Sequence, residues 1–330
     1  TAIGVSAFEG CSSLKSIEIP SSVTAIGVSA FEGCSGLTSI RVPDSVITIW
    51  SSAFAGCDGL TSVILPFVGS GLNATQNTYF GYIFGANFYL KQSEYVPSTL
   101  KTVIISNGSG VTSIGMSAFS GCSSLKSIEI PNSVITIGKS AFYGCWSLTS
   151  IEIPNSVTTI GQEAFSYCSS LTSIEIPNSV TTIGQEAFSY CSMLTNVEMS
   201  SNVTAIRAGT FNDCRYLQFN IYGNAKYLGN RNNKYVVLIR VTDINYSSYT
   251  IHENTKVIAE FAFSGCSNLT SIEIPSGVTT FNDLAFNGCS SLTSIEIPNS
   301  ITTIEGMAFH NCTNLKEIHY SGGIEQWKQL

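Results

Sequence analysis

Charged side chains are scarce in this chain of 330 residues. Only 11% of the residues are Asp, Glu, Lys or Arg, and the formal net charge is −7. Proteins that bind nucleic acid usually concentrate positive charge on one face, so this composition argues against a nucleic-acid partner and against an anionic membrane surface. Hydrophobic residues make up 44% of the chain, which is too many for a disordered segment. We therefore expect a folded protein that favours basic partners over acidic ones.

Several motifs with known chemistry are also missing from the sequence. It has no uninterrupted apolar run of roughly 18 residues, so nothing predicts insertion into a membrane. It has three histidines, no glycine-rich phosphate loop and no metal-binding motif. Its many Ser and Thr residues recur with the repeat described below and lack the His and Asp partners of a catalytic triad. We expect no enzymatic activity, no cofactor and no metal.

The N-terminal residues already match the middle of a repeat. Thr1–Gly4 has the same sequence as Thr24–Gly27. We therefore expect any export signal and any surface anchor to lie outside this segment.

The cysteines reveal the period of the repeat. Neighbouring cysteines within three groups are 23 residues apart, and each cysteine follows a Phe by three residues. The 11 cysteines are Cys11, Cys34, Cys57, Cys122, Cys145, Cys168, Cys191, Cys214, Cys266, Cys289 and Cys312. One cysteine per turn, in an apolar setting after Phe, suits a small buried hydrophobic residue better than a disulfide or a zinc ligand. We expect all of them to be reduced and buried.

One turn of the repeat can be followed from residue 14 to residue 36. Leu14, Ile17 and Ile19 alternate as in a short strand with one buried face, and Pro20 ends that strand. Ala30-Phe31 then predicts a short helical or 3-10 segment. Since one turn cannot bury its own apolar face, stability must come from stacked neighbours. The predicted fold is an α/β-type repeat solenoid, a right-handed coil with a parallel sheet on one face and short helical segments on the other.

The unit LxxIxIPxxVTxIGxxAFxxCxx resembles the BspA-like leucine-rich repeats of bacterial surface proteins, which also occur in some parasitic protozoa. The recurring Ala-Phe-x-x-Cys and Ile-x-Ile-Pro signatures carry this resemblance over nearly the whole chain. It implies a cell-surface or secreted protein, often described as an adhesin, and not an enzyme. The ending Tyr320–Trp327 also resembles the closing turn of such arrays, where an aromatic residue covers the last layer.

The repeat is interrupted twice, and the interruptions define the expected organisation. We expect one leucine-rich-repeat solenoid over 1–330, with an aromatic insertion at 67–99, a β-hairpin insertion at 222–248 and a C-terminal cap at 320–330. Ile83-Phe84 is expected to replace Ala-Phe in the first insertion, which leaves a long loop from Gly85 to Ser98. Insertions in repeat proteins often carry the binding function, although they can also merely repack the convex side.

Two features of the sequence suggest a binding surface. Glutamates recur at the outward-facing middle position of the strands, where stacked like charges do not stabilise a sheet. Ile64 and Ile104 interrupt this acidic column beside the aromatic insertion, so the exposed face becomes apolar there. The candidate ligand-binding residues are Tyr82, Phe88, Tyr89, Tyr95, Ile64, Ile104, Glu129, Glu152, Glu175 and Glu198. The glutamates could equally be a solvated face that keeps the sheet soluble.

The sequence therefore favours an extracellular or cell-surface binding module, adhesin-like and monomeric, for a protein or glycan ligand on a host or neighbouring cell. The alternative is a structural spacer that holds another domain away from the cell surface. A binder should concentrate its departures from the repeat on one face, whereas a spacer should scatter them.

Overall fold

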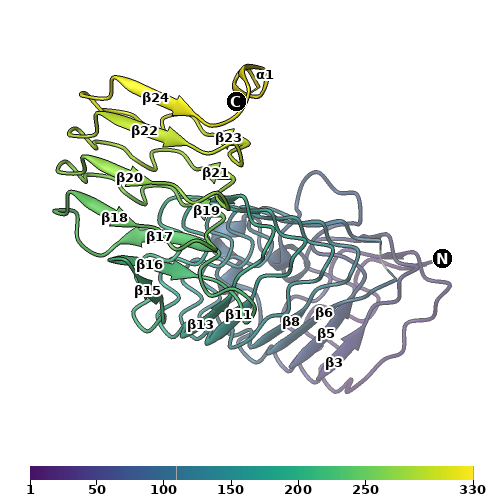
Figure 1. Ribbon diagram of the computed structural model, residues 1–330. Coiled ribbons are helices and arrows are strands. Elements are labelled where there is room, and N and C mark those ends of the chain that lie inside the picture. The colour runs from purple at the N-terminus through teal and green to yellow at the C-terminus, as the bar shows by residue number, and fades with distance from the viewer. Residues whose placement is uncertain (109, 330) are drawn as a thin grey trace. The chain divides into compact units, whose positions relative to one another are not determined.

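The computed structural model describes residues 1–108 and 110–329, so Ser109 and the last residue of the expected cap, Leu330, lie outside the described part. Within it the chain coils into a solenoid of stacked turns, as the sequence predicted (Figure 1). The contacts between Cα atoms divide it into two compact units. The first comprises residues 1–174, 186–195 and 211–216, and the second comprises residues 175–185, 196–210 and 217–330.

The first face of the solenoid is a parallel sheet built from the Ile-x-Ile segments. In the first unit it contains β3 (Ser39–Arg41), β5 (Ser62–Leu65), β6 (Thr102–Ile105) and β8 (Ser127–Glu129), paired in that order. In the second unit β18 (Ser248–Thr250) pairs with β20 (Ser271–Glu273), and β22 (Ser294–Ile297) pairs with β24 (Glu317–Tyr320). The remaining strands of this type are β11 (Ser173–Glu175) and β13 (Asn196–Glu198). Apolar and polar side chains alternate along these strands, which buries one face and exposes the other.

A second parallel ladder follows the Thr-x-Ile-Gly segment of each turn. Its strands are only two residues long, and each pairs with the same positions of a neighbouring turn, as Ile3 does with Ile26. They are β1 (Ala2–Ile3), β2 (Ala25–Ile26), β4 (Thr48–Ile49), β7 (Ser113–Ile114), β9 (Thr136–Ile137), β10 (Thr159–Ile160), β12 (Thr182–Ile183), β14 (Ala205–Ile206), β19 (Val257–Ile258), β21 (Thr280–Phe281) and β23 (Thr303–Ile304). The two ladders enclose the core between them.

The Ala-Phe corners of the regular turns are tight turns, whereas the sequence predicted short helical or 3-10 segments there. Ser29 (φ 54°) and Gly33 (φ 72°) place left-handed backbone on either side of Ala30-Phe31, which leaves too few residues for a helix. The corner backbone bonds to the next turn instead, because Phe31 N–H donates to the Ala53 carbonyl oxygen (2.8 Å). The described helices are η1 (Phe80–Phe84), η2 (Tyr89–Glu94) and α1 (Ile324–Trp327).

The core contains a column of stacked phenylalanines beside a column of cysteines. The Phe142 and Phe165 ring centroids lie 5.1 Å apart with an interplanar angle of 10°, and both side chains are fully buried. Cys168 Sγ lies beneath this pair and donates a hydrogen bond to the Phe142 carbonyl oxygen (3.2 Å). The same sulfur-to-carbonyl contact recurs between other turns, for example from Cys191 to Phe165 (3.2 Å). Cysteine thus fills a small apolar space and also satisfies a backbone acceptor.

The prediction that every cysteine is buried was wrong for two of them. All 11 cysteines are free thiols, but Cys11 is exposed and Cys312 is only partly buried. Both belong to outer turns, where one side of the Phe–Cys layer has fewer neighbours to cover it.

In the second unit the repeat gives way to antiparallel strands. β15 (Asn220–Tyr222) pairs with β16 (Ala225–Leu228), and β16 pairs with β17 (Val237–Val241), both antiparallel. β16 and β17 form a hairpin within the insertion predicted at 222–248. β15 adds a third strand that the sequence did not predict. β17 then pairs in parallel with β19, so the interruption rejoins the second ladder.

Candidate functional site

The aromatic insertion replaces one Ala-Phe corner with two short helices. Phe54 N–H donates to the Ile83 carbonyl oxygen (2.8 Å), the bond that a regular turn makes to alanine, so the predicted replacement of Ala-Phe by Ile83-Phe84 is confirmed. The bond to the following turn comes from η1 instead, because Phe80 N–H donates to the Ala118 carbonyl oxygen (2.7 Å). The insertion therefore keeps both neighbouring turns in register.

The long loop predicted from Gly85 to Ser98 was wrong, because η2 lies within it. Gly85 (φ 98°) ends η1, and a buried glutamine then holds η2 against the corner. Gln92 Oε1 accepts a hydrogen bond from Gly81 N–H (2.9 Å), and its Nε2 donates to the Ser117 carbonyl oxygen (3.0 Å). The sequence offered no signal for this role, since nothing local distinguishes Gln92 from a surface glutamine.

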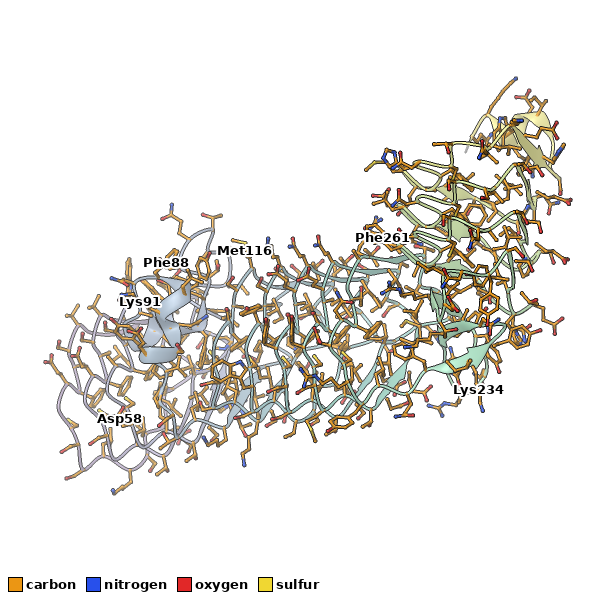
Figure 2. All side chains as sticks on the ribbon, turned by 90° about the vertical axis from the view of Figure 1, so that its left-hand side faces the viewer. Asp58, Phe88, Lys91, Met116, Lys234 and Phe261 are labelled. Carbon is orange, nitrogen blue, oxygen red and sulfur yellow. The ribbon has the colours of Figure 1, made fainter. Side chains whose placement is uncertain are left out.

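The candidate aromatic residues differ in exposure. Phe88 is 48% exposed and Tyr95 is 40% exposed, and the Phe88 ring lies 4.5 Å from that of Tyr89. Figure 2 labels Phe88 and Lys91 beside the two short helices. Tyr82 is partly buried and lines a different feature, an open pocket of about 540 Å³ that it shares with the exposed Trp50. The insertion thus presents aromatic surface in two places.

Ile64 and Ile104 lie on the strand side of the same turn. They are direct partners in the pairing of β5 with β6, and both are partly buried. Arg41 pairs with Ile64 on one side, and Glu129 pairs with Ile104 on the other. The structure therefore places the isoleucines together within a charged row of the sheet, whereas the aromatic candidates occupy the corner segment.

The four candidate glutamates differ in their surroundings. Glu129, Glu152 and Glu175 are exposed at the middle position of their turns. Glu198 is partly buried, and its Oε2 accepts a hydrogen bond from Arg231 N–H (3.0 Å) in the turn between β16 and β17. That contact ties the glutamate to the fold, so Glu198 is less available to a ligand than the other three.

A separate group of exposed aromatic residues was missed by the sequence reasoning. Tyr143, Trp146, Tyr167 and Tyr190 are between 37% and 58% exposed in neighbouring turns of the first unit. A signal was present, because Tyr167 and Tyr190 stand immediately before a cysteine, where Gly121 and Gly144 stand in the preceding turns.

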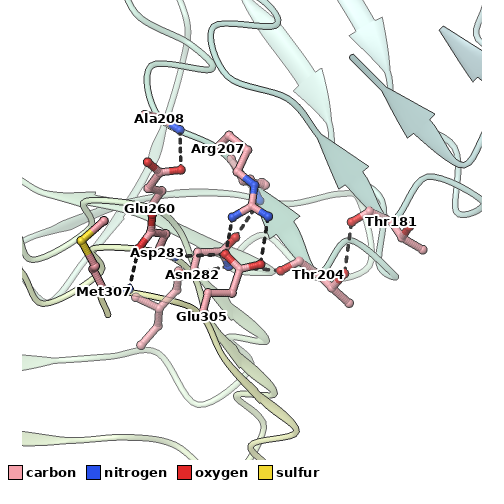
Figure 3. Close-up of polar contacts among 11 residues, drawn as sticks. Thr181, Thr204, Arg207, Ala208, Glu260, Asn282, Asp283, Glu305 and Met307 are labelled. Carbon is pink, nitrogen blue, oxygen red and sulfur yellow. Dashed lines mark hydrogen bonds and ion pairs between the residues drawn. The ribbon is translucent and has the colours of Figure 1, made fainter. Parts of the chain in front are cut away.

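In the second unit, a cluster of partly buried polar groups has the appearance of a site but is internally paired (Figure 3). Arg207 forms a bidentate ion pair with Glu305, and Glu260 accepts a hydrogen bond from Ala208 N–H (3.0 Å). Burial raises the pKa of Glu260. Asn282 is fully buried, accepts from Ile206 N–H (3.0 Å) and donates to two carbonyl oxygens. These contacts fasten the β14 segment to the later turns, which is a structural role.

We expect Asn282→Ala to destabilise the protein by about 2–3 kcal/mol, because it removes the side-chain partner of the buried Ile206 N–H and of the Thr204 carbonyl oxygen. Urea unfolding measures the loss, and hydrogen exchange should show weaker protection of the Ile206 amide. Asn299→Ala, at an exposed asparagine, is the control. Unchanged protection of Ile206 would contradict this role.

The rest of the surface offers little for chemistry. Across residues 1–108 and 110–329, no group of three or more His, Cys, Asp or Glu side chains is placed to hold a metal ion. No helix in the described part of the chain is long and apolar enough to cross a membrane. Burial raises the pKa of the thiols in the inner turns, for example to about 12 for Cys145, which disfavours the reactive thiolate there.

The stacked parallel turns and their regular spacing define a leucine-rich repeat protein, a class of solenoid that is typically non-catalytic. The family model described as BspA type leucine rich repeat region matches six copies, over residues 1–94, 89–218 and 242–329. The chain belongs to this family. No curated protein matches the sequence.

Several solved structures are similar to the chain. A leucine-rich repeat protein from Bacteroides ovatus is 28% identical, with 99% of this chain and 84% of that one covered and a TM-score of 0.43. A leucine rich cell surface protein from Faecalibacterium prausnitzii is 27% identical, with 100% and 85% covered and a TM-score of 0.30. The leucine rich repeat protein of T. pallidum is 26% identical, with 65% and 78% covered and a TM-score of 0.33.

Proposed function

We propose that this protein is a cell-surface or secreted binding module, adhesin-like, for a protein or glycan ligand on a host or neighbouring cell. The observation that carries the proposal is the aromatic insertion. The insertion takes the place of the short Ala-Phe corner of a regular turn, and it leaves Phe88 and Tyr95 substantially exposed. Large exposed aromatic side chains contribute more to binding than to folding.

The construction of the insertion supports a binding role. Gln92 and the corner hydrogen bonds hold η1 and η2 in place, so the aromatic side chains stand on ordered backbone. Ordered side chains lose less conformational entropy when a ligand binds. Within this proposal Phe88, Tyr89 and Tyr95 form the contact surface. Ile64 and Ile104, with Glu129 and Glu152, form a second contact surface on the sheet side, while Tyr82 lines the pocket beside Trp50.

The experiment is a binding screen with the intact chain. Labelled protein is applied to a glycan array and to a panel of immobilised extracellular proteins, and each ligand found is tested with Phe88→Ala/Tyr89→Ala. We expect this double variant to weaken binding by about tenfold or more, because it removes the paired rings. Deleting 85–98 is unsuitable, since the deletion removes Gln92 and disturbs the corner.

Phe261→Ala is the matched control, because Phe261 is also an exposed phenylalanine (37%) but lies outside the insertion. It should bind as the wild type does. If the wild type binds no component of either panel, the spacer function replaces this proposal. Binding that survives Phe88→Ala/Tyr89→Ala and fails with Ile64→Ser/Ile104→Ser would move the site to the sheet face.

A further inference from the structure

Each regular turn has two positions with left-handed backbone. One stands immediately before Ala-Phe and is most often serine, as at Ser140 (φ 52°). The other stands immediately before cysteine and is usually glycine, as at Gly144 (φ 67°). Glycine suits the second position because it has no Cβ atom to clash in this conformation.

Two consecutive turns depart from the repeat at both positions. Glutamates replace the serine at Glu163 (φ 54°) and Glu186 (φ 55°), and tyrosines replace the glycine at Tyr167 (φ 61°) and Tyr190 (φ 59°). Left-handed backbone is unfavourable for a bulky residue, so the tyrosines strain the fold. Their side chains stay 38% and 41% exposed, so burial in the core does not compensate for this strain.

The tyrosines belong to one continuous aromatic patch in the first unit. The rings of Tyr167 and Tyr190 stack with centroids 4.5 Å apart and an interplanar angle of 7°. Tyr143 continues the row at 5.3 Å from Tyr167 but is tilted by 56°. Trp146, in the same turn as Tyr143, is 58% exposed. We name these four residues the tyrosine patch.

The corners that carry the tyrosine patch are acidic. The sequence has no Lys or Arg between Lys139 and Arg207. Glu163 and Glu186 stand four residues before Tyr167 and Tyr190 in the same corners. The Asp213 carboxylate raises the pKa of the Tyr190 hydroxyl, which places a further negative charge beside the patch. The exposed cations nearest in sequence are Lys139, in the turn of Tyr143, and Arg215, in the turn of Asp213.

The Glu163 carboxylate is held in place by two hydrogen bonds. Ser140 Oγ donates a hydrogen bond to Glu163 Oε2 (3.0 Å), and Gln162 Nε2 donates to the other carboxylate oxygen (3.1 Å). Burial raises the pKa of Tyr143, followed by the neighbouring Tyr167 hydroxyl and then by the charges of Glu163 and Glu186. Aromatic rings edged with fixed carboxylates attract cations that can also stack.

We propose that the tyrosine patch binds an extended, arginine-rich segment of a partner protein. Guanidinium groups stack on the exposed rings of the patch and pair with the carboxylates of Glu163, Glu186 and Asp213. Arginine fits better than lysine because its planar group both stacks on rings and pairs with carboxylates. This inference rests on the proposed function in that the chain binds partners, but it concerns a different surface from the aromatic insertion.

The test uses the intact chain and a labelled synthetic peptide of alternating Arg and Ser, followed by fluorescence anisotropy. The same peptide with citrulline in place of Arg keeps the shape and removes the charge. We expect the Arg peptide to bind at least about tenfold more tightly than the citrulline peptide, and its affinity to fall as salt is raised.

Two variants that restore the repeat localise the binding. Tyr167→Gly/Tyr190→Gly returns glycine to the left-handed positions, so the fold should survive while the affinity for the Arg peptide falls about tenfold. Glu163→Ser/Glu186→Ser returns serine and should weaken binding and flatten its dependence on salt. Glu273→Gln/Glu296→Gln removes the same charge from exposed sheet-face glutamates of the second unit and should bind as the wild type does.

Three results would overturn the proposal. Equal affinity for the Arg and citrulline peptides would remove the role of charge. An unchanged affinity in Tyr167→Gly/Tyr190→Gly, with a lowered unfolding midpoint, would show that the stacked rings serve stability alone. Glycan binding lost in this variant, with no peptide binding by the wild type, would make the patch a sugar site. Phe88→Ala/Tyr89→Ala should leave peptide binding intact, so failure here is separable from failure of the insertion as a site.

Discussion

Phe165→Ala should lower the free energy of unfolding by about 3–5 kcal/mol, the range for removing a fully buried phenylalanine. Phe165 stacks on Phe142 at 5.1 Å and on Phe188 at 5.2 Å, and all three side chains are fully buried. The alanine leaves a cavity between two turns that cannot close without breaking the hydrogen bonds between them. Urea or thermal unfolding measures the loss.

Phe8→Ala is the matched control for this prediction. Phe8 occupies the same repeat position, but it stacks on Phe31 alone and is only partly buried, so we expect less than half of the loss. Because each turn contacts only its neighbours, hydrogen exchange should increase in the turns of Phe142 and Phe188 and stay unchanged near Phe286. An equal increase along the chain would contradict nearest-neighbour stacking.

The second large effect concerns the cysteines. In the native protein we expect a thiol reagent to modify Cys11 quickly, Cys312 more slowly and the other nine only after denaturant is added, because those nine are buried. Absorbance gives the number of thiols modified per chain, and mass spectrometry identifies the modified cysteines. Rapid reaction of the buried cysteines in native buffer would contradict the Phe–Cys layer.

The same burial predicts a dependence of stability on pH. Burial raises the pKa of Cys145 from 9.0 to about 12, and desolvation also raises that of Cys168. Thiols of the unfolded chain ionise at lower pH than the folded ones, so the stability present below about pH 9 should fall as the pH rises toward 12. Cys145→Ala/Cys168→Ala should show a smaller fall over this range. An identical fall would assign the effect to other groups.

Features that recur in every turn could be predicted from the sequence. Phe31, Cys34 and their equivalents repeat at one spacing, and a period of this length has few solutions other than stacked turns. The same logic identified Ile83-Phe84 as the substitute for Ala-Phe toward the preceding turn, but it did not show that Phe80 makes the bond to the following turn.

Features that depend on backbone conformation or on long-range partners could not be predicted. The left-handed backbone at Ser29 (φ 54°) excludes a helix at the corner, and a serine in the sequence does not predict this conformation. Asn282 acts through Thr204 and Ile206, more than seventy positions earlier in the sequence, so no local pattern reveals it. The sequence shows tyrosine at a position where other turns have glycine. Only the left-handed backbone at Tyr167 shows that this tyrosine is unfavourable for the fold.

The central claim is that binding resides where the chain departs from its repeat. The most direct measurement compares the wild type with Phe88→Ala/Tyr89→Ala/Tyr167→Gly/Tyr190→Gly on the same panels of glycans, extracellular proteins and the Arg peptide. We predict that the combined variant keeps the unfolding midpoint of the wild type to within a few degrees and loses about tenfold or more in affinity for each ligand found. A folded combined variant that binds every ligand as tightly as the wild type would contradict the claim.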